Sequence, residues 1–366
     1  MGFKCGIVGL PNVGKSTLFN ALTESSKAEA ANYPFATIEP NVGRVAVPDL
    51  RLKILSDISK SQKIIPTYID FVDIAGLVKG ASKGEGLGNK FLSHIREVDA
   101  IAHVVRCFED KNITHVSSSI DPLNDIDTIL TELKLSDLET LENKLQNLKK
   151  KSKSFDKDII NEIDFIEEVQ ENLNLNKKID KKFLEEKKLI LLNSLNLISF
   201  KPVLYVCNVD EKSIKSGNEL SNLVKNKALE EGNDVVLISA EIESQIAEFD
   251  NENDRQEMLD DLKLEESSLK KVVRTGYDLL ELITFFTSGI KETRAWTISK
   301  NTLAPTAGGK IHSDFENGFI RVETITYSDF IEYKGESSCR NLGKLRQEGK
   351  DYIIKDGDIC HFLFNV

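Results

Sequence analysis

A segment near the N-terminus, Gly9 to Thr17, combines the residue types and spacing that bind phosphate. Its sequence GLPNVGKST fits the phosphate-loop pattern G-x-x-x-x-G-K-[ST]. Glycines let several backbone N–H groups point at one anion, and a following helix adds partial positive charge. Lys15 is expected to reach the β- and γ-phosphates, and Ser16 to bind Mg²⁺. The loop's predicted nucleotide contacts are Asn12, Val13, Gly14, Lys15, Ser16 and Thr17.

Further polar residues follow this loop in an order that fits the same site. The Thr37 hydroxyl is expected to join Mg²⁺ once a γ-phosphate is bound, which would order its loop. Asp73 ends an apolar run and is expected to hold a metal-bound water. The Gly76 N–H is placed to reach the γ-phosphate. Each match alone is weak, but their order at the ends of predicted strands is specific.

Two later segments are expected to bind the base of the nucleotide. Asn208 follows an apolar run and is placed to hydrogen-bond the base. Ser239 and Ala240 follow the next apolar run, and their main-chain groups would back the base. Open α/β sheets bind ligands at the carboxyl ends of their strands, where all these residues fall.

The elements that position these residues are short apolar runs separated by helical patterns. Such a sequence predicts an α/β fold with a parallel sheet covered on both faces. The predicted strands are Phe3 to Val8, Val42 to Val47, Pro66 to Val72, Ile101 to Phe108, Lys201 to Cys207 and Asp234 to Ile238.

A different pattern interrupts this alternation. From Leu130 to Leu192 the chain has no glycine or proline and is rich in Leu, Lys, Glu and Asn. Apolar residues recur there at three-, four- and seven-residue spacings, which predicts an antiparallel coiled coil. The outgoing arm uses Leu138, Leu141, Leu145, Leu148 and Phe155, and the returning arm uses Ile159, Ile163, Ile166 and Leu173.

The C-terminal part changes composition again, with short strand-like runs between turns, and predicts a small α+β module. We therefore expect three domains. Residues 1–129 and 197–281 form the nucleotide domain, 130–196 the helical insertion and 282–366 the C-terminal module.

Composition narrows the functional classes. The net charge of −11 argues against a general nucleic-acid binder. No run of 18 apolar residues exists, and the N-terminus leaves no room for a signal peptide, so we expect a cytoplasmic protein without a membrane partner. The cysteines form no C-x-x-C pair, which argues against a zinc site. They are Cys5, Cys107, Cys207, Cys339 and Cys360.

The chain resembles translation-factor-type GTPases, and within them the Obg-related group. With the segments NYPFATIEPN from Asn32, GLVKGA from Gly76, NVDE from Asn208 and RAWT from Arg294, it is similar over its whole length to the YchF or Obg-like ATPase family. That resemblance implies a nucleotide domain, an inserted antiparallel coiled coil and a C-terminal TGS domain of β-grasp fold. It also implies ATP hydrolysis and association with ribosomes.

The base-reading segment departs from the usual GTPase motif Asn-Lys-x-Asp. The Asp of that motif accepts two hydrogen bonds from guanine, whereas Glu211 here is one methylene longer and Val209 replaces Lys. The two hydrogen bonds from guanine to the carboxylate would be lost or strained. The site would then no longer disfavour adenine by leaving that carboxylate unpaired. We expect ATP to be preferred to GTP; a true GTPase that tolerates Glu211 is the alternative.

A second departure concerns hydrolysis. Many GTPases carry a glutamine that orients the attacking water at the position of Leu77, and leucine has no polar group to do so. His115 is one candidate replacement, since the family is thought to use a histidine in this region. Asn12 is another, because it can help hold a cation such as K⁺ in related GTPases. A nucleotide-binding scaffold without hydrolysis is the further alternative.

Overall fold

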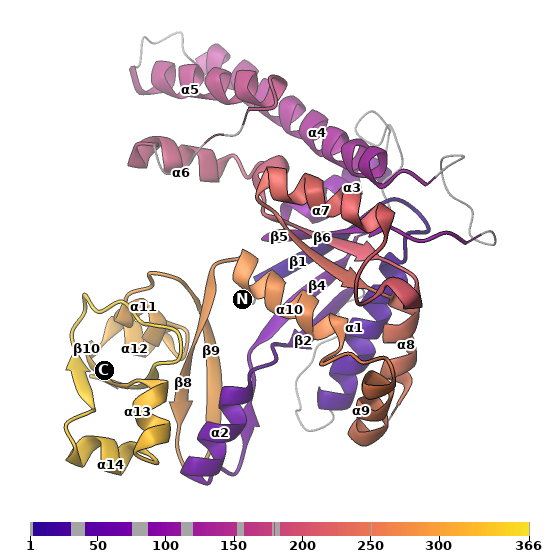
Figure 1. Cartoon of the computed structure of the whole chain (residues 1–366). Helices are drawn as coiled ribbons and strands as arrows, with labels where there is room; N and C mark the ends of the chain where they lie inside the picture. The colour runs from indigo at the N-terminus through magenta and orange to yellow at the C-terminus, as the bar shows by residue number, and fades with distance from the viewer. Residues whose placement is uncertain are drawn as a thin grey trace. The chain divides into compact units, whose positions relative to one another are not determined.

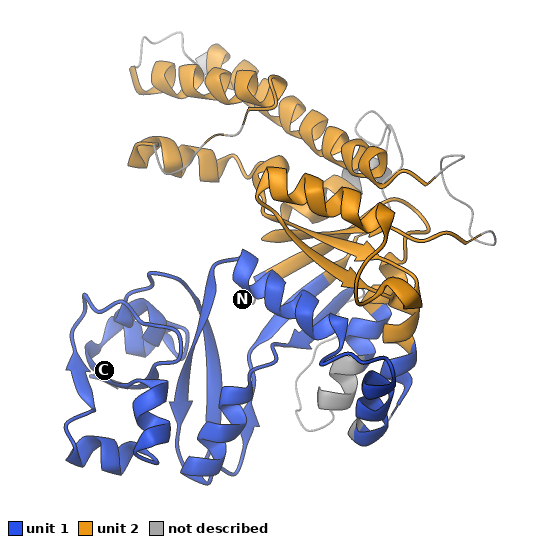
Figure 2. Ribbon diagram, in the orientation of Figure 1, with its two compact units in different colours: residues 1–3, 20–71, 245–366 blue, residues 4–19, 72–244 orange. Residues whose placement is uncertain are grey.

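The computed structural model describes residues 3–30, 41–74, 87–110, 120–151, 157–177, 179, 184–249 and 251–365 (Figure 1). The chain divides into two compact units, which are coloured separately in Figure 2. Unit 1 comprises Met1–Phe3, Asn20–Phe71 and Gln245–Val366, and unit 2 comprises Lys4–Phe19 and Val72–Ser244. None of the helices in the described ranges is long and apolar enough to span a membrane.

The predicted parallel sheet is present, and its strand order is β2-β4-β1-β5-β6-β7. The pairs β1–β5, β5–β6 and β6–β7 are parallel. All seven residues of β5 are buried, as expected for a strand with helices on both faces. The strands are β1 (Phe3–Val8), β2 (Val42–Ala46), β4 (Tyr68–Asp73), β5 (Ala100–Arg106), β6 (Val203–Asn208) and β7 (Asp234–Ile238).

Helices connect these strands, and two of them begin at predicted site residues, α1 at Lys15 and α8 at Ala240. Helix α7 starts with a capping box, in which Asn218 and Ser221 each bind the other's backbone N–H, and ends at Gly232 in the left-handed region. The connecting helices are α1 (Lys15–Ala30), α3 (Leu87–Arg96), α7 (Glu219–Glu231) and α8 (Ala240–Glu248), with the short turns η4 (Ile198–Phe200) and η5 (Glu211–Ser213).

The helical insertion consists of α4 (Pro122–Lys151), α5 (Lys157–Asn174) and α6 (Glu186–Ser194), here called the helical arm. Helices α4 and α5 run antiparallel, since Lys144 pairs with Glu162 at 3.0 Å whereas Lys134, further from the turn, bonds the Asn174 carbonyl oxygen. The predicted antiparallel pair is therefore confirmed.

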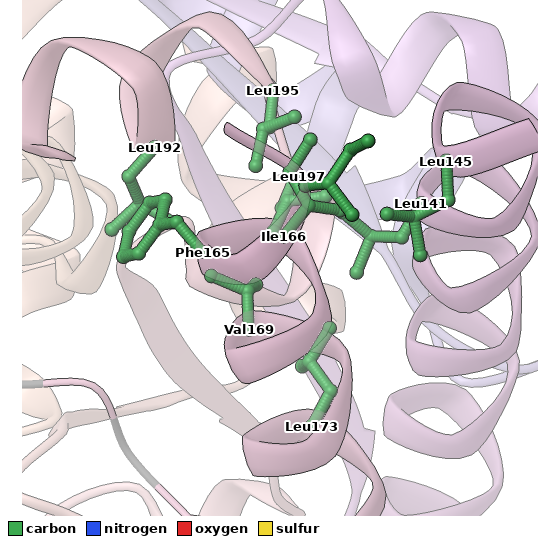
Figure 3. Close-up of a cluster of buried hydrophobic side chains, with 10 residues drawn as sticks. Leu141, Leu145, Phe165, Ile166, Val169, Leu173, Leu192, Leu195 and Leu197 are labelled. Atoms are coloured by element: carbon green, nitrogen blue, oxygen red, sulfur yellow. The ribbon is translucent and has the colours of Figure 1, made fainter. Parts of the chain in front are cut away.

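A third helix, α6, joins the pair and was not predicted as a separate packing partner. Its Lys188 lies over the Phe165 ring of α5, 5.2 Å from the ring centroid. Figure 3 shows the shared apolar core. Its buried members are Leu141, Leu145, Ile163, Phe165, Ile166, Val169, Leu173, Leu192, Leu195 and Leu197.

Unit 1 contains a second, mixed sheet in the order β11-β10-β12-β8-β9-β3. Its first long strand β8 lies parallel to its last strand β12, and an antiparallel strand flanks each of them, which is the β-grasp arrangement. The strands are β3 (Ile64–Ile65), β8 (Leu282–Ser288), β9 (Thr293–Ser299), β10 (Phe319–Ile325), β11 (Arg346–Glu348) and β12 (Ile359–Phe364). The remaining helices of this unit are α9 (Glu252–Asp261), α10 (Ser268–Leu279), α11 (Ala304–Gly309), α12 (Ser313–Asn317), α13 (Tyr327–Glu332) and α14 (Glu336–Asn341).

Two elements from the N-terminal third of the chain belong to this second sheet. Strand β3 pairs in parallel with β9, and α2 (Leu50–Ser59) buries Leu52 and Leu55 in a core with Phe286 and Phe330 (Figure 1). The β-grasp core is therefore completed by residues outside 282–366.

Candidate nucleotide-binding site

The phosphate loop lies between the end of β1 and the start of α1, as the sequence predicts. Asn12 and Gly14 both have positive φ angles, 63° and 99°, and the Leu18 N–H bonds the Gly14 carbonyl oxygen at 2.9 Å. A side chain at Gly14 would clash with the Asn208 amide, and one at Gly9 would clash with the Val104 carbonyl oxygen. Both glycines are therefore required by close approach.

Lys15 is the most buried charged group of the loop, with 8% of its surface exposed. Its Nζ donates to the Leu10 carbonyl oxygen at 2.6 Å, so the side chain folds back over its own loop. Burial lowers the Lys15 pKa, and the nearby Asp73 carboxylate opposes that shift. An anion at the loop would therefore meet a poorly solvated ammonium group, which strengthens attraction.

Asp73 ends β4 beside the loop and faces Ser16, with 3.5 Å between Ser16 Oγ and Asp73 Oδ2. Burial raises the Asp73 pKa, while Lys15 and the Ser16 hydroxyl lower it. The Ser16 hydroxyl and the partly desolvated Asp73 carboxylate suit Mg²⁺, which prefers oxygen ligands. The residues therefore fit the ion; Ser16 would hold it and Asp73 would hold a water of its shell. When bound, Mg²⁺ neutralises charge on phosphate oxygens.

Asn208, at the end of β6, connects the loop to the start of α8. Its Nδ2 donates to the Val13 carbonyl oxygen at 3.0 Å, and its Oδ1 accepts from the Ala240 N–H at 3.0 Å. A primary amide has two N–H donors and two acceptor lone pairs. These two bonds use one donor and one acceptor position of the Asn208 amide, and its contact with a base stays a prediction.

The other predicted base-reading residues lie in two different environments. The Val209 side chain is buried, and its N–H bonds the Ile238 carbonyl oxygen at 2.8 Å. Glu211 is exposed at the start of η5, whose N-cap Asp210 accepts from the Ser213 N–H. Ser239 is buried, and its carbonyl oxygen accepts from Glu243. The roles of these residues stay predictions.

Three predicted site residues, Thr37, Gly76 and His115, lie outside the described residues, as does Leu77. The described part of the site therefore comprises the phosphate loop, Asp73 and the base-side segments at Asn208 and Ser239.

Asn218 makes a contact after β5 that the sequence does not predict. Asn218 Nδ2 donates to the Cys107 carbonyl oxygen at 2.7 Å, and this ties the segment after β5 to the start of α7. The pattern Asn-x-x-Ser at 218–221 signals the helix start. No sequence signal indicates the partner 111 residues earlier.

His103 of β5 is a buried histidine close to the phosphate loop. Burial lowers its pKa to about 3, and the Lys15 charge adds to that shift. Within the described ranges, its Nδ1 has no hydrogen-bond partner. The folded protein therefore holds His103 neutral.

We predict a pH-dependent loss of stability caused by His103. The unfolded chain binds a proton below pH 6.5 and the folded chain does not, so stability falls with pH over that window. The free energy of unfolding should fall between pH 7 and pH 5 by about 2 kcal/mol more in the parent than in His103→Phe. Urea denaturation at both pH values measures this difference, and equal losses in the two proteins would contradict it.

The loop geometry, the parallel sheet and the polar residues at its carboxyl edge define a P-loop nucleoside triphosphatase. A family model described as "50S ribosome-binding GTPase" matches residues 4–151, and the model YchF-GTPase_C, described as "Protein of unknown function (DUF933)", matches 282–365. The chain belongs to the YchF family.

Relatives that match this chain over its whole length support that assignment. The "Ribosome-binding ATPase YchF" of Haemophilus influenzae is 54% identical, and that of Bacillus subtilis 50%; each comparison covers all of both chains. The solved structure of the Schizosaccharomyces pombe YchF GTPase has a TM-score of 0.88 and 40% identity, covering 99% of this chain and 98% of that one.

Proposed function

We propose that this chain is an ATP-hydrolysing switch protein that binds ribosomes and works in the cytoplasm, where ribosomes are found. The observation that carries the proposal is the side-chain group Lys15, Ser16 and Asp73 at the loop, in a chain so similar over its full length to ribosome-binding ATPases. The ribosome as partner is inferred from the names of these relatives, and the nucleotide chemistry is inferred from the site.

Each loop residue has a distinct role in this proposal. Lys15 exchanges its bond to the Leu10 carbonyl oxygen for a phosphate oxygen, which stabilises the charge of the transferring group. Ser16 would bind the Mg²⁺ that accompanies the phosphates, and Asp73 would hold a water bound to that ion. Asn208 fixes the loop relative to the base-binding edge through its bonds to Val13 and Ala240.

The preference for ATP over GTP rests on the base-reading segment. Glu211 is exposed, and its side chain is one methylene longer than the Asp that accepts two hydrogen bonds from guanine in GTPases. Val209 is buried and has no ammonium group in place of the usual Lys. The double variant Glu211→Asp with Val209→Lys is expected to shift relative affinity toward GTP by roughly 1–3 kcal/mol. Competition binding measures the shift. Unchanged relative affinity would place specificity in main-chain contacts instead.

The hydrolysis step needs a group that orients water in place of Leu77. If His115 serves, His115→Ala should lower turnover on the order of 10–100-fold and leave ATP affinity nearly unchanged, since it would act only in the transition state. The measurement is phosphate release at saturating ATP with K⁺ present. Equal turnover in both proteins would transfer the role to Asn12 with a bound cation such as K⁺, or to a partner.

Ribosome association is tested by co-sedimentation. The protein with Mg²⁺ and a non-hydrolysable ATP analogue is centrifuged with purified ribosomes through a sucrose cushion. We expect co-sedimentation that depends on the nucleotide. Identical recovery in the pellet with and without ribosomes would contradict the proposed partner.

A further inference from the structure

One arginine joins the C-terminal end of α3 to both ends of the helical arm. Arg96 Nη2 donates to Thr140 Oγ1 at 2.7 Å and to Ser136 Oγ at 3.0 Å, both on the outgoing helix α4. Arg96 Nη1 donates to the carbonyl oxygen of Asn196, in the segment where the chain returns from the arm, at 3.4 Å. One guanidinium group therefore contacts the chain on its way out and on its way back.

Arg96 also lies next to the fully buried Asp137, which closes the base of the arm. Asp137 accepts from the N–H groups of Ile198 and Ser199 at 2.9 and 2.8 Å and from Ser199 Oγ at 2.6 Å. The Arg96 guanidinium lies 3.7 Å from this carboxylate. Because Asp137 is completely buried, its charge needs these partners, and the arrangement holds α4, η4 and α3 together.

The main chain of Arg96 is fixed as well as its side chain. Its carbonyl oxygen accepts from Asn196 Nδ2 at 3.1 Å and from Lys201 Nζ at 2.8 Å. Lys201 also donates to the Val98 carbonyl oxygen. A shift or rotation of the end of α3 must therefore break these bonds or carry the base of the arm with it.

The first residue of α3, Leu87, follows the phosphate-site residue Asp73 in the sequence. The helix begins at Leu87, and one segment joins it to Asp73, the residue beside Ser16. In nucleotide switches, segments near the γ-phosphate are ordered by triphosphate and released after hydrolysis. Helix α3 is the first described helix after Asp73, and its last residue, Arg96, contacts the arm.

We propose that Arg96 is a positioning residue that couples the nucleotide state to the orientation of the helical arm. The inference rests on the proposed function for its nucleotide. Two groups of bonds, side chain to α4 and main chain to the returning segment, make α3 and the arm base move as one body. Removing the guanidinium leaves the phosphate loop intact and deletes the direct bonds from α3 to α4, while the main-chain bonds to the returning segment remain.

The test measures the arm directly in the full chain. Cysteines replace exposed Glu171 on α5 and exposed Asn226 on α7, and spin labels are attached; the five native cysteines are buried and should resist labelling. Distance distributions are recorded without nucleotide and with Mg²⁺ and a non-hydrolysable ATP analogue. The backgrounds are the parent, Arg96→Ala, Arg96→Lys and the control Arg274→Ala, which removes a separate arginine–glutamate pair.

We expect the nucleotide to shift the distance distribution in the parent and in Arg274→Ala. The shift should be smaller in Arg96→Ala, in which the main-chain bonds to Asn196 and Lys201 remain. Arg96→Lys should recover only part of the difference, since an ammonium group cannot reach α4 and the Asn196 carbonyl oxygen at once. Analogue affinity should change less than about twofold in Arg96→Ala, which separates coupling from binding. Thermal unfolding of each variant checks that the arm is folded. If the arm of Arg96→Ala is unfolded, Thr140→Val, which removes one acceptor of the Arg96 guanidinium, takes its place.

Two results would overturn the inference. In the first, the nucleotide changes the distance distribution as much in Arg96→Ala as in the parent. In the second, the parent binds the analogue but its distance distribution does not change. A parent that fails to bind the analogue would instead overturn the proposed function, so the two failures are distinguishable.

Discussion

Lys15→Ala is expected to abolish tight ATP binding, with a loss of affinity of about 100-fold or more. The buried ammonium would form a charge-assisted bond to phosphate, and a contribution of about 3 kcal/mol corresponds to about 150-fold in affinity. Ser16→Ala is expected to have the same direction, measured as loss of Mg²⁺-dependent affinity. Titration of a fluorescent ATP analogue measures both variants.

The same substitution should leave the fold intact. Burial lowers the Lys15 pKa, which means that the folded protein holds this charge at a cost. Its removal is therefore expected to leave the free energy of unfolding unchanged or higher. Exposed Lys53→Ala is the matched control and should bind ATP as the parent does. Unchanged ATP affinity in Lys15→Ala would show that the loop is not the nucleotide site.

Leu55→Ala is expected to destabilise the β-grasp core by about 2–5 kcal/mol, the usual cost of emptying a fully buried leucine site. Leu55 on α2 is completely buried with Phe286 and Phe330, although it lies more than 200 residues earlier in the chain. Its neighbour Ile54 is 41% exposed, so Ile54→Ala should cost less than about 1 kcal/mol.

Hydrogen exchange locates the effect of Leu55→Ala. Amides of β8 and β9 should exchange faster in Leu55→Ala than in Ile54→Ala, because α2 covers that sheet. Equal stability of the two variants would contradict the assignment of α2 to the β-grasp core.

The phosphate loop could be predicted because its chemistry is local. Gly9, Gly14, Lys15 and Ser16 lie within eight residues, and the strand before them and the helix after them follow from periodicity. Strand β7 also begins and ends where the apolar run from Asp234 to Ile238 does. Short-range patterns therefore suffice for the loop and for most of the parallel sheet.

The contacts that could not be predicted join residues far apart in sequence. Leu52 and Leu55 give α2 an apolar face, but periodicity does not say which sheet covers it. Leu192 was included in the helical range without any sign that α6 packs against α5. Arg96 and Asp137 come together because α3, α4 and η4 meet in the fold. Single polar residues within helical patterns do not predict such a meeting.

The base-reading side shows the same limit within the site. Asn208 was expected to contact the base, and its bonds to Val13 and Ala240 became visible only in three dimensions. Those bonds depend on the exact meeting of the loop, β6 and α8. A motif therefore predicts the residue type that a site needs, while its neighbours determine what the residue holds in place.

The most direct test of whether this chain is an ATP-hydrolysing switch is a phosphate-release assay. The purified protein is given ATP or GTP with Mg²⁺ and K⁺, with or without ribosomes. We expect slow release from ATP alone, faster release with ribosomes, and a kcat/KM for ATP higher than that for GTP by about tenfold or more. Faster turnover of GTP would identify a true GTPase. No phosphate release under any condition would contradict hydrolysis and favour a nucleotide-binding scaffold.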